Sequence, residues 1–176
     1  QIFESINSTG ETLKASDLIR NYILMNKTDQ VQTKYFTNYW KVIENNLEND
    51  ASKLEEFFRF YVTIKNYDLV NKNDLYEKFI ELWNREVINQ TEEIVLNEIV
   101  AYSKCFNQLY LKGTVSGAEK AISILKKIKS NMPAPLLMEL LMWYNNELIS
   151  VDQLSACINL VNSYLIRRHM SNLDTS

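Results

Sequence analysis

The chain has 176 residues, of which 46% are hydrophobic and 23% charged, so it can bury a full core and does not have the composition of a disordered chain. It contains only three glycines and two prolines, where average usage gives roughly a dozen and about nine; this scarcity argues against a β-sandwich, a β-barrel or a Gly-rich nucleotide cradle, which need many special turn residues. Nineteen Lys and Arg against 22 Asp and Glu give a net charge of −3, so no overall positive field draws the chain onto DNA or a membrane.

Apolar side chains recur at intervals of three and four residues along most of the chain, which is the periodicity of amphipathic helices. Capping residues indicate where these helices begin. In the first half of the chain we expect helices over 17–25 after a Ser16 cap, over about 30–49, over 54–64 behind a Ser52–Glu55 capping box, and through 76–87 after Asn73. In the second half we expect a helix through 95–109 that starts after Thr91 and is ended by Gly113, and one through 122–128 behind a Ser116–Glu119 capping box. The last two expected helices run through 137–144, opened by Pro133 and Pro135, and through 154–165 behind a Ser150–Gln153 capping box.

These elements predict an all-α fold, a multi-helix orthogonal bundle of about eight helices with a short irregular N-terminal segment. No fixed-period repeat, low-complexity tract or shift in composition divides the chain. We therefore expect a linker segment over residues 1–15 and one helical domain over 16–176. Because the chain begins at Gln1 and not at Met, we treat it as a segment of a longer polypeptide. We interpret the following aromatic residues as core packing and not as stacking platforms: Trp40, Phe58, Trp83 and Tyr102.

Residues for catalysis or metal binding are few. Cys105 and Cys157 are far apart in apolar sequence, which is typical of reduced core thiols in a cytoplasmic protein. His169 is the single histidine, and with two distant cysteines it matches no zinc spacing, so we expect an exposed helix-end histidine. The sequence has no Walker-type loop, no signal peptide and no apolar run near the ~18 residues of a membrane span.

The turn over residues 7–10 is a candidate phosphate contact. It offers three short polar side chains and one glycine, and Ser16 and Asp17 then open a helix whose free N–H groups could face an anion. The alternative is an ordinary polar turn that leads into a helix.

Two basic clusters follow later in the chain. Arg167 and Arg168 precede His169 near the end of the last expected helix, where they either offer two forked donor sets to a phosphate or complement the helix dipole. A local basic face serves either solvation or contact with a nucleic-acid backbone, and its members are Lys120, Lys126, Lys127 and Lys129.

Two N-terminal segments form a specific pattern. Residues 3–13 read Phe-Glu-Ser-Ile-Asn-Ser-Thr-Gly-Glu-Thr-Leu, and residues 16–24 read Ser-Asp-Leu-Ile-Arg-Asn-Tyr-Ile-Leu. This pattern resembles the N-terminal domains of GmrSD-type restriction endonucleases, ParB-like proteins of bacterial anti-phage defence. Looser matches at 39–40, 57–61 and 164–168 extend the resemblance over nearly the whole chain.

The resemblance implies a two-part domain. In the family, a ParB-like α/β half carries an Asp-Gly-Gln-Gln-Arg motif linked to nucleotide hydrolysis and DNA cutting, a helical half follows, and many members add an HNH-type nuclease domain. This sequence contains neither the motif nor an HNH cluster. It would therefore be the helical half, with no catalytic residue, metal ligand or cofactor of its own, and a nucleoside triphosphate and a divalent metal would belong to the full-length protein.

The resemblance also implies a border to the nucleotide or DNA site, formed by Asn7, Gly10, Asp17, Arg20 and Asn21, with Arg167 and Arg168 as nucleic-acid contacts. The expected function is that of the helical portion of a nucleotide-dependent endonuclease that restricts modified DNA in phage defence. Its expected partners are DNA, the ParB-like half and an HNH-type domain, with a homo-oligomer left open and no membrane. The alternative is a non-enzymatic helical scaffold that contacts a partner protein or domain through an apolar helix face.

Overall fold

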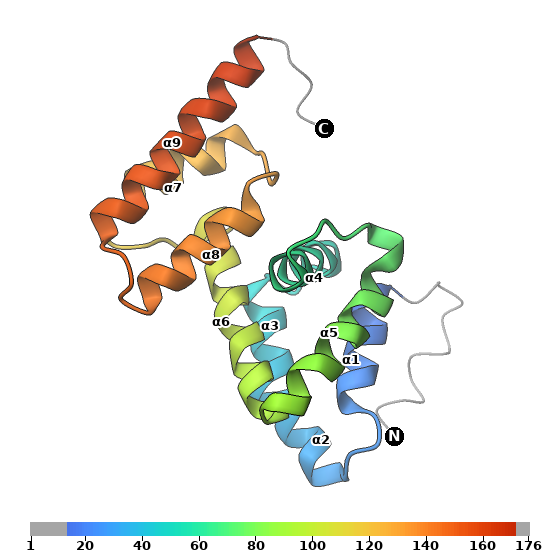
Figure 1. The fold of residues 1–176 in the computed structure, drawn as a ribbon. Coiled ribbons are helices and arrows are strands. Elements are labelled where there is room, and N and C mark those ends of the chain that lie inside the picture. The colour runs from blue at the N-terminus through green and yellow to red at the C-terminus, as the bar shows by residue number, and fades with distance from the viewer. Residues whose placement is uncertain (1–13, 172–176) are drawn as a thin grey trace. The chain divides into compact units, whose positions relative to one another are not determined.

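The computed structural model describes residues 14–171, and all regular secondary structure in that range is helical (Figure 1). Residues 1–13 and 172–176, which include Asn7 and Gly10, lie outside it. The elements are α1 (Ala15–Leu24), α2 (Asp29–Tyr35), a π-helical turn η1 (Phe36–Trp40), α3 (Lys41–Asn46), α4 (Ala51–Asn66), a 3-10 turn η2 (Lys72–Asp74), α5 (Leu75–Asn89), α6 (Glu92–Tyr110), α7 (Glu119–Ile128), α8 (Ala134–Asn145) and α9 (Val151–Met170). Since η1 joins α2 to α3 without a break, this range holds eight continuous α-helical segments, and the predicted all-α fold is confirmed.

The helices form two compact units. Unit 1 ends at Asn97 and unit 2 begins at Glu98, so the division falls inside α6. The sequence predicted one helical domain over 16–176, and nothing in its composition indicates this division, because a continuous helix without Gly or Pro passes through it. The predicted domain boundaries stay a prediction.

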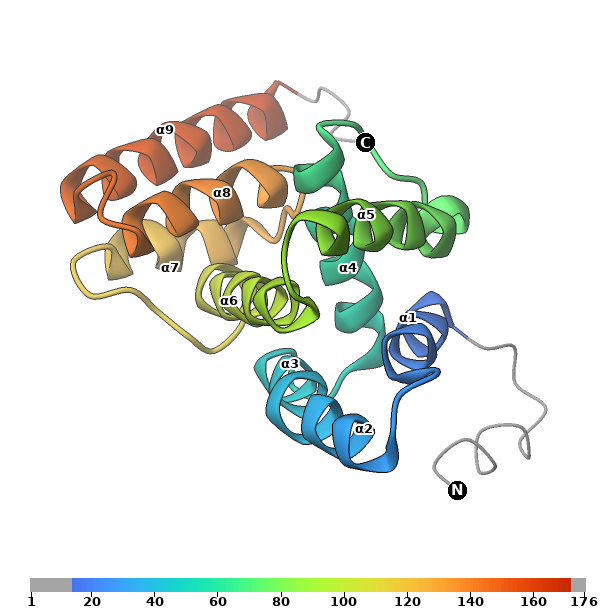
Figure 2. The ribbon, with the colours of Figure 1, turned by 60° about the horizontal axis from the view of Figure 1, so that its bottom comes forward.

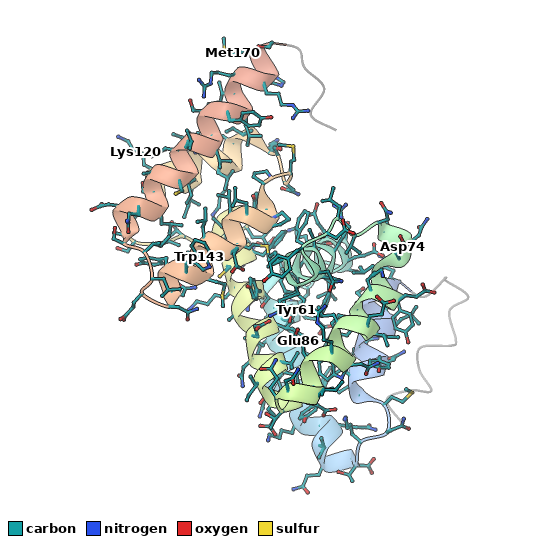
Figure 3. All side chains as sticks on the ribbon, viewed as in Figure 1. Tyr61, Asp74, Glu86, Lys120, Trp143 and Met170 are labelled. Carbon is teal, nitrogen blue, oxygen red and sulfur yellow. The ribbon has the colours of Figure 1, made fainter. Side chains whose placement is uncertain are left out.

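Unit 1 is built around an aromatic core. In it, α4 packs against α5, and α1 packs against both. Trp40 stacks on Phe58 with ring centroids 5.6 Å apart, and Phe79 meets Phe58 edge-on at the same distance. Trp83 on α5 and Tyr61 on α4 are also buried, with Tyr61 deep inside the unit (Figure 3). The predicted packing role of Trp40, Phe58 and Trp83 is confirmed.

The π-helical turn interrupts what the sequence predicted as one regular helix over about 30–49. A π turn adds one residue to the helical repeat and so rotates the residues that follow it. The Tyr35 hydroxyl donates to Glu92 Oε2 (3.0 Å) and the Tyr39 hydroxyl to Glu93 Oε2 (3.4 Å), which ties this helix to the start of α6. Trp40, the last residue of the turn, is buried in the core of unit 1.

Unit 2 is held by packing along α9. Both α7 and α8 pack against α9, and Figure 2 shows α8 and α9 side by side. The Asn162 side chain on α9 donates a buried hydrogen bond to the Ala121 carbonyl on α7 (2.9 Å). Tyr102 is buried in this unit, as predicted, and so is Cys105, whereas Cys157 is only half-buried and is not a core thiol.

The helix starts in unit 1 differ from those predicted. Ser16 lies buried within the first turn of α1 and is not its cap, because the helix already begins at Ala15 after Lys14. Asp50, and not Ser52, caps α4, since its carboxylate accepts from the backbone N–H groups of Ser52 (2.8 Å) and Lys53 (3.3 Å). Asn73 lies within the 3-10 turn that leads into α5 and does not cap it.

Of the starts predicted from α6 onward, three are confirmed and one is wrong. Thr91 Oγ1 accepts from the Ile94 N–H (3.4 Å), Pro135 lies in the first turn of α8, and Ser150 forms a reciprocal capping box with Gln153. Ser116 does not cap α7, whose start has no side-chain cap.

Gly113 does not end α6 as predicted. It lies three residues beyond the helix and outside the left-handed region. Its N–H donates to Asn107 Oδ1 (2.9 Å), and a Cβ at this position would lie only 2.4 Å from the same oxygen. A larger residue at 113 would therefore displace the Asn107 side chain that accepts this hydrogen bond.

Within residues 14–171, six non-glycine residues adopt positive φ angles within three residues of a helix C-terminus. Left-handed backbone is strained for residues with a Cβ, by roughly 1–2 kcal/mol each. The residues are Asn26, Glu48, Asn49, Tyr67, Lys129 and Glu147.

Candidate functional site

Asp17 and Arg20, two of the predicted border residues, meet inside unit 1. Arg20 Nη2 lies 3.1 Å from Asp17 Oδ1, and Nη1 lies 3.7 Å from Glu44 Oε1. The guanidinium also lies 6.0 Å from the centre of the Trp40 ring, whose Nε1 donates to the same Glu44 oxygen (2.7 Å). The Arg20 side chain is 18% exposed. Its charge is thus engaged by two carboxylates and one ring of its own unit.

The rest of the predicted border is only partly described. Asn21 lies half-buried on α1, and its carbonyl accepts from the N–H of Met25 at the helix C-cap (2.8 Å). Asn7 and Gly10 lie outside the described residues. The structure therefore brings Asp17 and Arg20 together, and the role of this border at a nucleotide or DNA site stays a prediction.

Arg167 and Arg168 have different hydrogen-bond partners at the end of α9. Consecutive helical residues are turned by about 100°, so the two guanidinium groups find different partners: Arg167 Nε donates to the Ser163 carbonyl (3.2 Å) and Arg168 Nη1 to the Tyr164 hydroxyl (3.1 Å). Both lie in the last turn, where they complement the helix dipole. His169 is exposed at the end of the helix, as expected. The two arginines thus remain two separate donor sets, and their contact with nucleic acid stays a prediction.

The lysines of the predicted basic face, on α7 and at its C-terminal end, also differ in their surroundings. Lys120 lies near the start of the helix (Figure 3). Lys126 donates to the Gly113 carbonyl, and partial burial lowers the pKa of its ammonium group. Lys127 lies on the last turn of α7, and Lys129 caps its C-terminus. Only part of the predicted basic face is therefore directed to solvent.

Lys127 and Lys129 line two hollows in the surface of unit 2. The basic hollow has a volume of about 450 Å³, and its charged lining is Lys112, Lys126, Lys127, Lys129 and Glu119. The apolar hollow has a volume of about 510 Å³ and lies where the C-terminal ends of α7 and α9 meet. Four lysines against one glutamate give the basic hollow a local excess of positive charge, which makes it a candidate site for an anion.

The two units carry opposite net charge. From Lys14 to Asn97, 11 Lys and Arg are outnumbered by 14 Asp and Glu, which gives −3; from Glu98 to Ser171, eight outnumber five, which gives +3. The chain therefore contains a basic unit although its overall net charge is −3. The sequence pattern did not predict this division or the contribution of Lys112, because both depend on where the chain folds into separate units.

A second polar cluster in unit 2 centres on Glu139. Its carboxylate accepts from the Tyr102 hydroxyl (2.5 Å) and from Trp143 Nε1 (3.0 Å), so it joins α6 to α8. Burial, followed by the Glu139 carboxylate, raises the pKa of the Tyr102 hydroxyl above its ordinary value. Burial likewise raises the pKa of Cys105 to about 12. Neither group is therefore prepared as a nucleophile at neutral pH.

Between Lys14 and Ser171, no three His, Cys, Asp or Glu side chains come together in a group that could hold a metal ion, and no helix is long and apolar enough to span a membrane. The comparisons with known proteins add no relative. No family model, curated protein or solved structure matches the chain. The basic hollow of unit 2 is thus the candidate site that its own geometry supports best.

Proposed function

We propose that the chain is the helical, non-catalytic portion of a nucleotide-dependent endonuclease that restricts modified DNA in phage defence, and that unit 2 contacts the nucleic-acid backbone. The resemblance of residues 3–24 to GmrSD-type proteins supports the family assignment. The single observation that supports nucleic-acid contact is the basic hollow, with four lysines and one glutamate around about 450 Å³. In this proposal the nucleoside triphosphate, the divalent metal and the HNH-type domain belong to the full-length, cytoplasmic protein.

Backbone contact is the chemistry that suits these lysines. A lysine ammonium binds phosphate as a point charge and releases condensed counterions, which gives affinity without sequence preference. The positive charge is gathered in unit 2, so it acts locally although the chain as a whole is acidic. Arg167 and Arg168 would add further phosphate contacts from the last turn of α9.

The DNA contact is tested by removing the two lysines that line both hollows. We expect Lys127→Gln with Lys129→Asn to weaken duplex binding to the same degree for unrelated sequences. The slope of log K against log salt should fall by about 0.9 for each phosphate that the variant no longer neutralises. Asparagine is chosen at 129 because it tolerates the positive φ angle there. Fluorescence anisotropy with labelled DNA at several salt concentrations measures both quantities.

The matched control is Lys41→Gln with Lys104→Gln, two exposed helical lysines outside both hollows. It removes the same charge and should leave the salt slope unchanged. Equal weakening by both double variants would show that only net charge matters and would contradict the site.

The non-catalytic assignment is tested in nucleotide-hydrolysis and modified-DNA cleavage assays. We expect no activity from the 176-residue chain and activity from the full-length protein, because the chain lacks the Asp-Gly-Gln-Gln-Arg motif and the HNH cluster. Robust cleavage by the chain alone would contradict the assignment.

One observation favours the alternative of a helical scaffold. Trp143 on α8 is 44% exposed, yet its ring nitrogen is fixed by Glu139, and Leu136 lies on the same side of the helix and is 55% exposed. A rigid, exposed tryptophan beside an apolar side chain is typical of a protein-binding surface. If the Lys127 and Lys129 substitutions left DNA binding unchanged, this face would become the preferred site.

A further inference from the structure

We infer that the apolar hollow of unit 2 binds an unpaired nucleobase from the same strand whose phosphates lie in the basic hollow. This inference rests on the proposed nucleic-acid contact and deepens it, because it names single-stranded nucleic acid, or a base turned out of a duplex, as the ligand. The geometric basis is that Lys127 and Lys129 line both hollows.

The lining of the apolar hollow matches the two surfaces of a base. Half of its lining residues are apolar, with Met132, Ile166 and Met170 among them, and the other half are polar: Ser130, Asn131 and His169 beside the two lysines. A base has apolar faces and a polar edge that donates and accepts hydrogen bonds. At about 510 Å³ the hollow is within the 300–1,000 Å³ range of small-ligand sites.

The methionines favour a flat apolar ligand. Met132 is 44% and Met170 77% exposed, so two flexible, polarizable side chains stand in water at this site. Met170 is the last residue of α9 (Figure 3), and Met132 lies in the turn between α7 and α8, so the two approach the hollow from different elements. Such side chains can close over the two faces of a base and gain contact that solvent does not provide.

Charge explains why the ligand is a nucleotide strand and not a neutral apolar molecule. The lysines between the hollows, together with His169 at the end of α9, surround the apolar walls with cationic or titratable groups and no carboxylate among the lining residues. A nucleic-acid strand carries a base next to each phosphate. The protein has an apolar hollow next to a basic one, so a base and its neighbouring phosphate can each meet a surface of matching chemistry. In a paired duplex the base faces are stacked on one another, so only an unpaired base can enter.

The test compares three labelled DNAs at one salt concentration: a 12-nucleotide single strand, the same strand with abasic sites, and a duplex. We expect the single strand to bind on the order of tenfold more tightly than the abasic strand, which has the same phosphates but no bases. In Met132→Gln with Met170→Gln this preference should fall towards one, while affinity for the abasic strand stays unchanged. Leu160→Gln is the control, since it is an equally drastic change at a 68% exposed site on α9 outside the hollow.

The outcomes separate this inference from the proposed function. Equal binding of the single strand and the abasic strand would overturn the base site and leave the backbone contact standing. No binding of any of the three DNAs would overturn both. Preferential binding of an amphipathic Leu- and Glu-rich peptide, weakened by the methionine substitutions, would also overturn the base site and assign the hollow to a protein partner.

Discussion

Replacement of Phe58 by Ala is expected to lower the free energy of unfolding of unit 1 by about 3–5 kcal/mol, the largest effect of any substitution considered for this protein. Phe58 is fully buried and contacts three other rings: it stacks on Trp40, meets Phe79 edge-on and lies 5.2 Å from Phe57. Its removal loses the burial of the ring, leaves a cavity and separates the aromatic contacts between the π turn, α4 and α5.

The measurement is chemical denaturation followed by tryptophan fluorescence in a Trp143→Phe background. The remaining tryptophans, Trp40 and Trp83, both lie in unit 1, so the signal reports on that unit. Tyr67→Ala is the control, because it also removes an aromatic ring but from a side chain that is 96% exposed, and its effect should stay within about 0.5 kcal/mol. A decrease below about 1 kcal/mol for Phe58→Ala would contradict the described core.

Replacement of Glu139 by Ala is expected to destabilise unit 2 by about 2–3 kcal/mol, the second largest effect. Hydrogen bonds to a charged group are worth more than neutral ones, and the removal of the acceptor takes away the hydrogen bond that the buried Tyr102 hydroxyl donates to Glu139. The Trp143 ring nitrogen is deprived of its Glu139 acceptor at the same time.

Two further variants make the Glu139 prediction specific. Glu139→Gln keeps one side-chain oxygen that can accept from Tyr102 but not the second, so its destabilisation should lie between that of Ala and zero. Glu147→Asn removes an exposed carboxylate just beyond α8 and should have little effect. Circular dichroism during denaturation follows all three; equal destabilisation by Glu139→Ala and Glu147→Asn would mean that Glu139 acts only through its charge, against the geometry.

Helix content and core could be predicted from the sequence because both depend on local periodicity. Apolar side chains at intervals of three and four predicted each α-helical segment, and Trp40, Phe58, Trp83 and Tyr102 are buried as expected. Cap positions were less predictable where several polar residues compete: Asp50 lies two residues before Ser52, and the carboxylate is the group that binds the free N–H groups.

The partners of the charged residues could not be predicted, since they depend on tertiary contacts. Arg20 is engaged by Glu44 and Trp40, which lie 20 or more residues further along the chain, and Lys126 by the carbonyl of Gly113. Neither periodicity nor charge pattern shows which basic side chains already have a partner. The two hollows could not be predicted for the same reason, since one of them forms where the C-terminal ends of α7 and α9 meet.

The positive φ angles after the helices explain how a chain with three glycines can turn so often. Tyr67 directly follows α4, and Lys129 directly follows α7, in a backbone conformation that a glycine would adopt without strain. Each such turn lowers the folding stability slightly compared with a glycine, but it places a side chain at the helix end. At Lys129 that side chain belongs to both hollows of unit 2, so a glycine there would relax the backbone and remove a cation from the surface. Under the proposed nucleic-acid contact, Lys129→Gly is therefore expected to raise folding stability and to lower the affinity for DNA at the same time.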